Sequence, residues 1–227
     1  MEINVNKKLL TALVAVGVSA LMGCKGNSAQ QMSSQPVDQT FHGALPCADC
    51  SGIDTTLLLD NDGTYILEQT YIGARDGDQS FFESGLWAKD GEKIRLTKSD
   101  DQKSYYLSKG ENLVMLDIEG NKIESSFNYE LQRVKPKKLA GEYSYMADAA
   151  LFTDCSTGKR YAVTESLDLE QGYHQVGVEG GTPVYVEVEG YYSVRPSMED
   201  GQFDPALIQT GKIHFDKSKS CNMKKQF

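Results

Sequence analysis

From Phe41 to Val134 the chain consists of short apolar runs separated by turn residues, and this pattern restricts it to β structure. Runs such as "TYILEQTYIG", "FFESGLWA", "KIRLT" and "KSYYL" are rich in Thr, Tyr, Ile, Leu and Phe. The turns are centred on Asn61-Asp62-Gly63, Asp90-Gly91 and Glu119-Gly120-Asn121, because Gly and Asn tolerate positive φ. Repeated hairpins of this kind close most naturally into a small antiparallel barrel or a sandwich. We expect the last strand of this region within "KIESSFNYELQRV".

The start of the chain is typical of an exported protein. Lys7 and Lys8 precede an apolar run from Leu9 to Met22, which is shorter than the roughly 20 residues of a transmembrane helix. This arrangement predicts a secretory signal peptide over residues 1–23. The run ends in "LMGC", which resembles a bacterial lipobox, and we therefore expect Cys24 to be acylated and to become the mature N-terminus. The alternative is an ordinary cleavage site followed by an incidental cysteine.

The residues after Cys24 indicate where the anchored protein resides. An Asp directly after the lipidated cysteine tends to retain lipoproteins at the inner membrane, and here that position is Lys25. We therefore expect outer-membrane lipid to hold the acyl anchor, with the chain facing the periplasm. Residues 24–37 are polar and small, and they predict a flexible tether with an average span of about 20 Å.

The second half of the chain predicts another β module. Residues 135–139, within "VKPKKLAG", interrupt the alternation and are interpreted as a linker between residues 38–134 and residues 140–227. "GEYSYMADAALFTDC" and "KRYAV" predict a hairpin that turns near Ser156-Thr157-Gly158, and "GKIHFD" predicts a last strand.

One helix is expected in this second module. It lies within "ESLDLEQGYHQVG", with Gly172 near its end, and the following "PVYVEVEGYYSV" alternates Val184, Val186 and Val188 with glutamates. Several strands with one helix in about 90 residues fit a five-stranded barrel of the OB kind, although a sandwich stays open. The fold class is therefore mainly all-β, with one short helix.

Charge and cysteine content exclude some functions and favour disulfides. The formal net charge of −9 argues against nucleic-acid partners, which require a basic face. Apart from Cys24, four cysteines remain in a chain predicted to be exported, and an even number suggests disulfide bonds. Three connectivities are possible, and the two-module organisation favours Cys47–Cys50 and Cys155–Cys221.

Four stretches carry a resemblance to a known family: the lipobox, "LPCADC" followed by "GIDTTLLL", "MLDIEGNKIESSFNYEL", and "YMADAALFTDCSTGKRY". Together they resemble the NlpE family of copper-homeostasis and envelope-stress lipoproteins of Gram-negative bacteria. The resemblance implies a lipocalin-like N-terminal barrel and a C-terminal OB fold. It also implies an outer-membrane lipoprotein that activates the Cpx response through an inner-membrane sensor histidine kinase. Copper tolerance and sensing of surface contact are further implied roles.

Three interpretations of Cys47 and Cys50 remain open. A redox-active dithiol is disfavoured, because thioredoxin-type pairs precede a helix whereas "SGIDTTLLL" predicts a turn and a strand. Two thiolates suit Cu(I), and His42 and Met32 are candidate further ligands if the loop folds back. The remaining interpretation is a small disulfide at the rim of the barrel, because an oxidising compartment closes such pairs. No cofactor is required by any of these patterns, and copper is the one candidate.

The second bridge is the better candidate for a redox sensor. Loop-closure entropy assigns about 2 kcal/mol to a ring of about four residues and about 4 kcal/mol to a ring from Cys155 to Cys221. The larger value is comparable to the whole stability of a small domain. Loss of oxidising power would leave this bridge open, which makes the periplasmic disulfide-forming machinery an expected partner.

No pattern in the sequence predicts an enzyme. There is no nucleophile elbow, no H-E-x-x-H and no phosphate-binding loop, and His42, His174 and His214 are isolated from one another. The leading hypothesis is therefore a sensor of envelope stress that contacts the inner-membrane kinase through its N-terminal domain. The alternatives are a periplasmic copper-binding protein that uses Cys47 and Cys50, and a carrier of a small apolar molecule inside the barrel.

Overall fold

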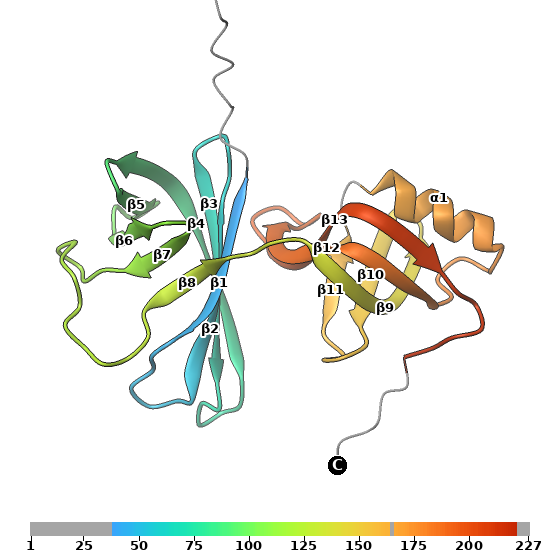
Figure 1. Ribbon diagram of the computed structural model, residues 1–227, viewed down its shortest axis with the longest axis horizontal. Coiled ribbons are helices and arrows are strands. Elements are labelled where there is room, and N and C mark those ends of the chain that lie inside the picture. Colours follow the sequence, from blue (N-terminus) through green and yellow to red (C-terminus); the bar gives the residue numbers. More distant parts are fainter. Residues whose placement is uncertain (1–37, 164–165, 222–227) are drawn as a thin grey trace, which may run out of the picture. The chain divides into compact units, whose positions relative to one another are not determined.

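The computed structural model describes residues 38–163 and 166–221, which form two closed β-barrels and one helix (Figure 1). The expected fold class, mainly β with two barrels and one short helix, is confirmed. The signal peptide and tether predicted for residues 1–23 and 24–37 lie outside the described residues, as do Cys24, Lys25 and Met32. Within the described ranges, no helix is long and apolar enough to cross a membrane.

The first barrel is an antiparallel meander of eight strands in sequence order, closed by the pairing of its last strand with its first. Its strands are β1 (Gln39–Leu45), β2 (Gly52–Leu59), β3 (Thr64–Ile72), β4 (Gln79–Asp90), β5 (Lys93–Lys98), β6 (Lys103–Lys109), β7 (Asn112–Met115) and β8 (Glu130–Arg133). The turns predicted at 61–63 and 90–91 join β2 to β3 and β4 to β5.

Alternating side chains fill the interior of this barrel. Leu57 lies opposite Leu67 and Leu59 opposite Tyr65, and all four side chains are buried. Their burial follows from the period of two along a strand, which sends every second residue inward. Trp87 packs partly against this core and donates its indole N–H to the Asp60 carbonyl at 2.8 Å.

The strand expected within "KIESSFNYELQRV" is mostly a loop, and only Glu130–Arg133 pairs as a strand. A single bridge joins Leu116 to Lys122 around the predicted turn at 119–121. Beyond it, side chains accept backbone N–H groups: Ser125 accepts from Phe127, and Asn128 accepts from Glu130. These local hydrogen bonds compete with strand pairing, which the alternation of side chains does not reveal.

The second barrel has five strands in the spatial order β10-β11-β13-β12-β9, and β11–β13 is its parallel pair. Its strands are β9 (Lys137–Met146), β10 (Ala149–Asp154), β11 (Arg160–Val163), β12 (Val184–Pro196) and β13 (Phe203–Phe215). The hairpin that turns at 156–158 and the inward face made by the valines of β12 are both confirmed.

Three details of the second module differ from expectation. Strand β9 begins at Lys137, inside the segment predicted as a linker, because it pairs with β12 from Lys137 onward. "GKIHFD" is the second half of a strand that already begins at Phe203. "GEYSYMADAALFTDC" forms two strands joined by Ala147 and Asp148, which both have positive φ. This turn lacks Gly and Asn, so the sequence carried only a weak signal for it.

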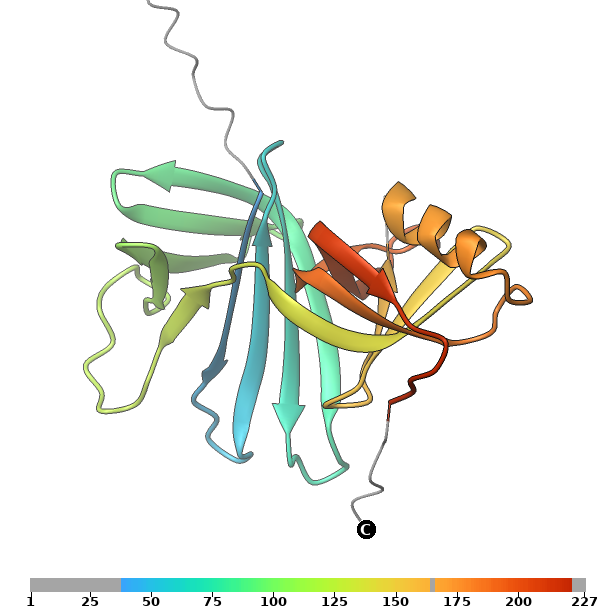
Figure 2. The same cartoon turned by 45° about the vertical axis from the view of Figure 1, so that its right-hand side comes forward.

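Helix α1 (Leu167–Val176) packs against β9 and β13 of the second barrel (Figure 2). The Ser166 hydroxyl accepts from the Leu169 N–H as an N-cap, and Gly177, in the left-handed region, ends the helix. Gly172 is therefore in the middle of the helix and not near its end. A Cβ at this position would lie 2.7 Å from the ring of Phe215, which explains a glycine inside the helix.

Candidate functional site

The first cysteine pair lies in the loop that joins β1 to β2. Cys47 and Cys50 form a disulfide whose Cα atoms are 5.4 Å apart. The loop closes directly above the paired residues Leu45 and Ile53, and the Ser51 N–H donates to the Ile72 carbonyl at 2.8 Å. Both cysteines are partly exposed, so solvent and reductants reach this bridge from the rim of the barrel.

The chain that follows Cys50 gives its thiol no activation by a helix. Strand β2 begins at Gly52, two residues later, and it runs antiparallel to β1. Reactive C-x-x-C cysteines owe much of their low pKa to the N-terminus of a following helix. This geometry therefore gives no support to a thioredoxin-type dithiol.

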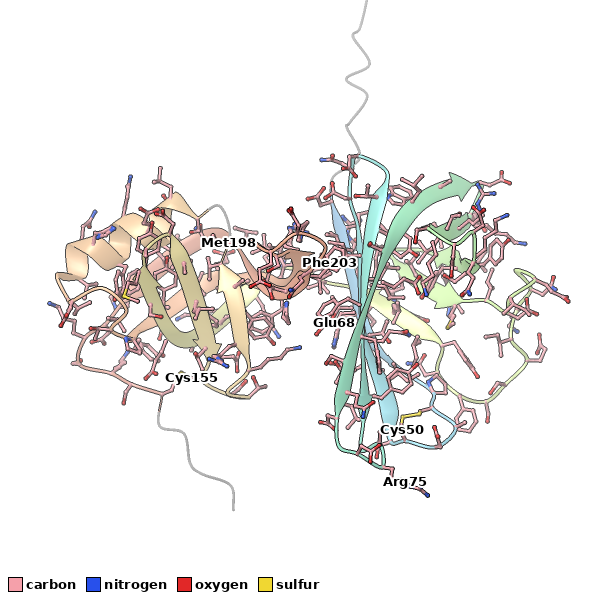
Figure 3. The ribbon with its side chains drawn as sticks, turned by 180° about the vertical axis from the view of Figure 1, so that it is seen from behind. Cys50, Glu68, Arg75, Cys155, Met198 and Phe203 are labelled. Atoms are coloured by element: carbon pink, nitrogen blue, oxygen red, sulfur yellow. A yellow bond between two sulfur atoms is a disulfide. The ribbon has the colours of Figure 1, made fainter. Side chains whose placement is uncertain are left out.

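A pocket of about 770 Å³ opens beside this bridge, between the Cys47–Cys50 loop and the turn that joins β3 to β4. It is lined by Cys50, Tyr71, Arg75 and Phe81, among others. Figure 3 shows Cys50 and Arg75 at the same end of the first barrel. The Tyr71 and Phe81 rings meet edge to face, with centroids 5.6 Å apart. The pocket thus combines an aromatic wall with the disulfide and one cation.

The structure does not bring His42 to the two cysteines. His42 lies on the outer face of β1, and its Nε2 is 2.7 Å from Asp54 Oδ1 on β2. The hydrogen bond from His42 lowers the pKa of Asp54. Among the described residues, no group of three or more His, Cys, Asp or Glu side chains forms a metal site. Of the candidate copper ligands that the structure describes, Cys47 and Cys50 are therefore the two that lie together.

Buried side chains pack together in the interior of the first barrel. Eleven buried residues form its core, including Phe41, Leu96, Tyr106 and Leu131. A cavity of about 180 Å³, lined by Trp87 and others, lies at the end away from the cysteines. Pockets for small molecules usually measure about 300–1,000 Å³. This cavity is smaller than such pockets, and the carrier of an apolar molecule inside the barrel stays a prediction.

The second cysteine pair attaches the end of the described chain to the second barrel. Cys155 directly follows β10 and Cys221 follows β13, and their Cα atoms are 5.0 Å apart in a disulfide that encloses a sequence separation of 66. The Cys221 N–H donates to Glu142 Oε1 at 2.9 Å, and the Asp216 N–H donates to the Tyr185 carbonyl at 3.0 Å. Lys219 Nζ also lies 5.4 Å from the centroid of the Tyr185 ring, so residues 216–221 contact the barrel at a few points besides the bridge.

A buried carboxylate organises the turn that carries Cys155. Asp154 is 5% exposed, and its Oδ1 accepts the backbone N–H and hydroxyl groups of both Ser156 and Thr157. The Tyr192 hydroxyl donates to Asp154 Oδ2, and its ring stacks on Tyr161 with centroids 3.8 Å apart. Burial by itself raises the pKa of Asp154, but the hydrogen bonds outweigh it and the pKa lies below its usual value.

Sequence reasoning missed the link between Asp154 and Tyr192. The spacing of Asp154, Ser156 and Thr157 is the signal for an Asx-type turn, and it could have predicted the first half of this cluster. Tyr192 lies 38 residues away and reaches Asp154 only because β12 and β10 belong to the same barrel. Nothing local in the sequence indicates that contact.

Comparison with known proteins identifies the two barrels. The family model of the NlpE N-terminal domain matches residues 41–126, and that of the NlpE C-terminal OB domain matches residues 133–222. Lipoprotein NlpE of Escherichia coli (strain K12) is 42% identical over 231 residues, which cover 96% of this chain and 98% of that protein. The chain belongs to the NlpE family.

Solved structures of related proteins exist. The crystal structure of the Cpx pathway activator NlpE from Escherichia coli is 42% identical and covers 81% of this chain and 97% of that chain, with a TM-score of 0.37. A structure from Shewanella oneidensis is 37% identical and covers 48% of this chain and 96% of that chain, also with a TM-score of 0.37. Scores of this size add nothing to the sequence comparison, which alone establishes NlpE family membership.

The Asp154 cluster leads to a stability prediction for this NlpE family member. We expect Asp154→Asn to lower the free energy of unfolding of the second barrel by about 2–3 kcal/mol at pH 7, because Tyr192 loses a charged acceptor. Since the folded-state pKa is depressed, this stabilisation is present above the ordinary pKa of 3.8 and disappears as pH falls through the lower folded-state value. The difference between the two proteins should therefore shrink below pH 3.8.

Hydrogen exchange of the β10 and β12 amides measures this effect in the full chain, while the fluorescence of Trp87, the single tryptophan, follows the first barrel. Asp148→Asn is the matched control, because Asp148 is exposed and, among the described residues, accepts a hydrogen bond from the Tyr145 hydroxyl alone. Equal exchange in the Asp154 and Asp148 variants at pH 7 would contradict the prediction.

Proposed function

We propose that this chain is an outer-membrane lipoprotein that senses envelope stress and activates the Cpx two-component response by contacting the inner-membrane sensor histidine kinase. The observation that carries the proposal is the match along 96% of the chain to the Escherichia coli lipoprotein, whose solved structure is described as that of the Cpx pathway activator. The stresses we propose are surface contact, defects of lipoprotein trafficking and loss of oxidising power. In this proposal the chain binds and signals and is not an enzyme.

Two features of the sequence support an anchored sensor. The lipobox ending at Cys24 supplies an acyl anchor in outer-membrane lipid, and Lys25 lacks the acidic signal for retention at the inner membrane. When sorting fails, the protein stays in the same membrane as the kinase. Confinement to one membrane raises the effective concentration of the two proteins without any new contact.

The second barrel supports a redox-sensitive element. Its bridge encloses a long ring, for which loop-closure entropy gives about 4 kcal/mol. Few other contacts hold residues 216–221 to the barrel, so an open bridge would release this segment and loosen the domain. We therefore propose Cys155–Cys221 as the redox-sensing bond and the periplasmic disulfide-forming machinery as the partner that sets its state.

A role in copper homeostasis is the second candidate. The bridge between Cys47 and Cys50 is partly exposed at the rim of the barrel, so its reduced form would present two thiolates to solvent. Thiolates are preferred ligands of Cu(I). We propose that any direct copper site uses these two residues, with remaining ligands from solvent or a partner.

The sorting signal gives the first test of the proposed function. We expect Lys25→Asp to raise Cpx output several-fold, because the protein then stays at the inner membrane beside the kinase. Reporter expression and membrane fractionation measure the two effects together. Lys25→Ser, which adds no retention signal, is the control and should leave output at its normal level. Retention at the inner membrane without a rise in output would refute the proposal.

The long-range bridge gives the second test. We expect the double variant Cys155→Ser, Cys221→Ser to lose about 2–4 kcal/mol of stability in the second barrel and to raise Cpx output. The matched control is Cys47→Ser, Cys50→Ser, which opens a short ring and leaves the second barrel intact. Denaturant unfolding, hydrogen exchange and the reporter give the result. A loosened second barrel with unchanged output would remove redox sensing from the proposal.

Copper binding is tested by titrating Cu(I) into the reduced full chain in competition with a Cu(I) chelator. If the second candidate is correct, one Cu(I) binds per chain, and Cys47→Ser removes the binding. The variant Cys155→Ser, Cys221→Ser should bind as the unchanged chain does. Absence of stoichiometric binding, or binding that survives Cys47→Ser, would rule out a site at these two residues.

A further inference from the structure

One end of the first barrel is farthest, along the strands, from the predicted lipid anchor. Strand β1 begins at Gln39 and runs to Leu45, so the chain from Cys24 joins the barrel at one end and the Cys47–Cys50 loop lies at the other. The antiparallel order places four connections at this second end: residues 46–51, residues 73–78, residues 99–102 and residues 116–129. We call these loops and the strand ends beside them the distal end.

Exposed apolar side chains gather at the distal end. Among the described residues, six large apolar side chains of the first barrel are exposed, and four of them lie at this end: Ile118 at 88%, Phe127 at 70%, Phe81 at 55% and Ile72 at 37% exposure. The other two, Phe82 and Leu86, lie farther along β4. Ile118 and Phe127 belong to the loop between β7 and β8, where alternation in a strand cannot explain their exposure. Apolar groups that cluster on a surface mark interaction sites more often than scattered ones.

The pocket beside Cys50 provides a recess within this apolar surface. Tyr71 and Phe81 continue the inward-facing rows of β3 and β4, because Tyr65 and Leu67 of the same row in β3 are buried in the core. Near the hairpin tip this row leaves the packed interior and lines the pocket of about 770 Å³. The volume suits one or two bulky side chains of a partner, at the scale of ordinary binding pockets of about 300–1,000 Å³.

The charge of the distal end selects among possible partners. Its four loops hold eight acidic residues and two basic ones, Arg75 and Lys122, and Lys122 is already paired with Glu124 at 3.4 Å. A surplus of carboxylates repels an anionic lipid surface and a second copy of the same end. It attracts a basic protein surface, and complementary charge both speeds encounter and fixes orientation.

We propose that the distal end is the docking surface for a protein partner that presents basic residues around an exposed apolar segment, with that segment seated in the pocket beside Cys50. This inference rests on the proposed function, in which the partner is the periplasmic part of the sensor kinase. Attachment of the anchor at the opposite end leaves the distal end free to face away from the membrane to which the protein is tethered.

The test uses full-length protein in cells that carry Lys25→Asp, the change expected to raise Cpx output. Ile118→Ser combined with Phe127→Ser should abolish that rise, because two exposed apolar contacts are lost. Leu86→Ser is the matched control, since Leu86 is 64% exposed on β4 but lies outside the distal end. We expect the control to keep the raised output. All proteins must accumulate equally, as measured by immunoblot.

Binding of the purified lipoprotein, in neutral lipid nanodiscs, to the periplasmic part of the kinase gives a second readout. The Ile118 and Phe127 changes should weaken binding about tenfold or more, the range of interface hot spots. Asp49→Asn with Asp76→Asn should slow association several-fold at low salt and little at high salt. Glu92→Gln, in the turn at the opposite end, should leave the association rate unchanged.

The outcomes separate this inference from the proposed function. If Lys25→Asp raises output but the Ile118 and Phe127 changes leave both output and binding unaffected, the docking surface is elsewhere and the inference fails. If Lys25→Asp fails to raise output and the kinase does not bind at all, the proposed function fails. Binding of phosphatidylglycerol vesicles, or dimerisation in sedimentation, that depends on Ile118 and Phe127 would also overturn the inference.

Discussion

Closure of the hydrogen-bonded sheet is the constraint on which both halves of this protein depend. In each barrel every strand pairs with a neighbour on both sides over at least part of its length, and every second side chain of these strands points inward. Leu57 and Leu59 in the first barrel, and Val184, Val186 and Val188 in the second, follow this pattern. Buried side chains pack together inside both barrels, and our leading proposals place function on the loops, the rims and the outer surfaces.

The two disulfides lie outside this hydrogen-bonded framework and differ in what they constrain. Cys47–Cys50 tightens a loop whose ends are already fixed by the pairing of Leu45 with Ile53. Cys155–Cys221 instead holds a segment that follows the last strand, next to a turn organised by Asp154. A change in redox state would therefore affect a single loop in the first barrel but the attachment of the chain end in the second. This difference is the physical basis of our proposal that the second barrel carries the redox-sensing bond.

Several elements followed directly from local chemistry, and each error of prediction has a physical explanation. The glycine-containing turns, the valine face of β12 and the presence of one helix were all predicted, because each depends on residues close together in the sequence. The turn at Ala147 and Asp148 and the loop before β8 were not, since Ala gives no turn signal and side chains of Ser125 and Asn128 replace strand partners. Gly172 was wrongly expected near the end of the helix. The ring of Phe215, which requires a glycine at this position, is distant in the sequence.

The sequence alone determined the β class, the two-module order, the family resemblance and the cysteines available for pairing, since period, turn residues and motif spacing are local properties. Only the tertiary structure decided which side chains pack together inside the first barrel, that His42 pairs with Asp54 away from the cysteines, and that Tyr192 reaches Asp154. The same holds for the gathering of Phe81, Ile118 and Phe127 at one end of a barrel. These facts depend on which strands become neighbours when the sheet closes. Strand pairing involves residues far apart in the sequence, so local patterns do not determine it.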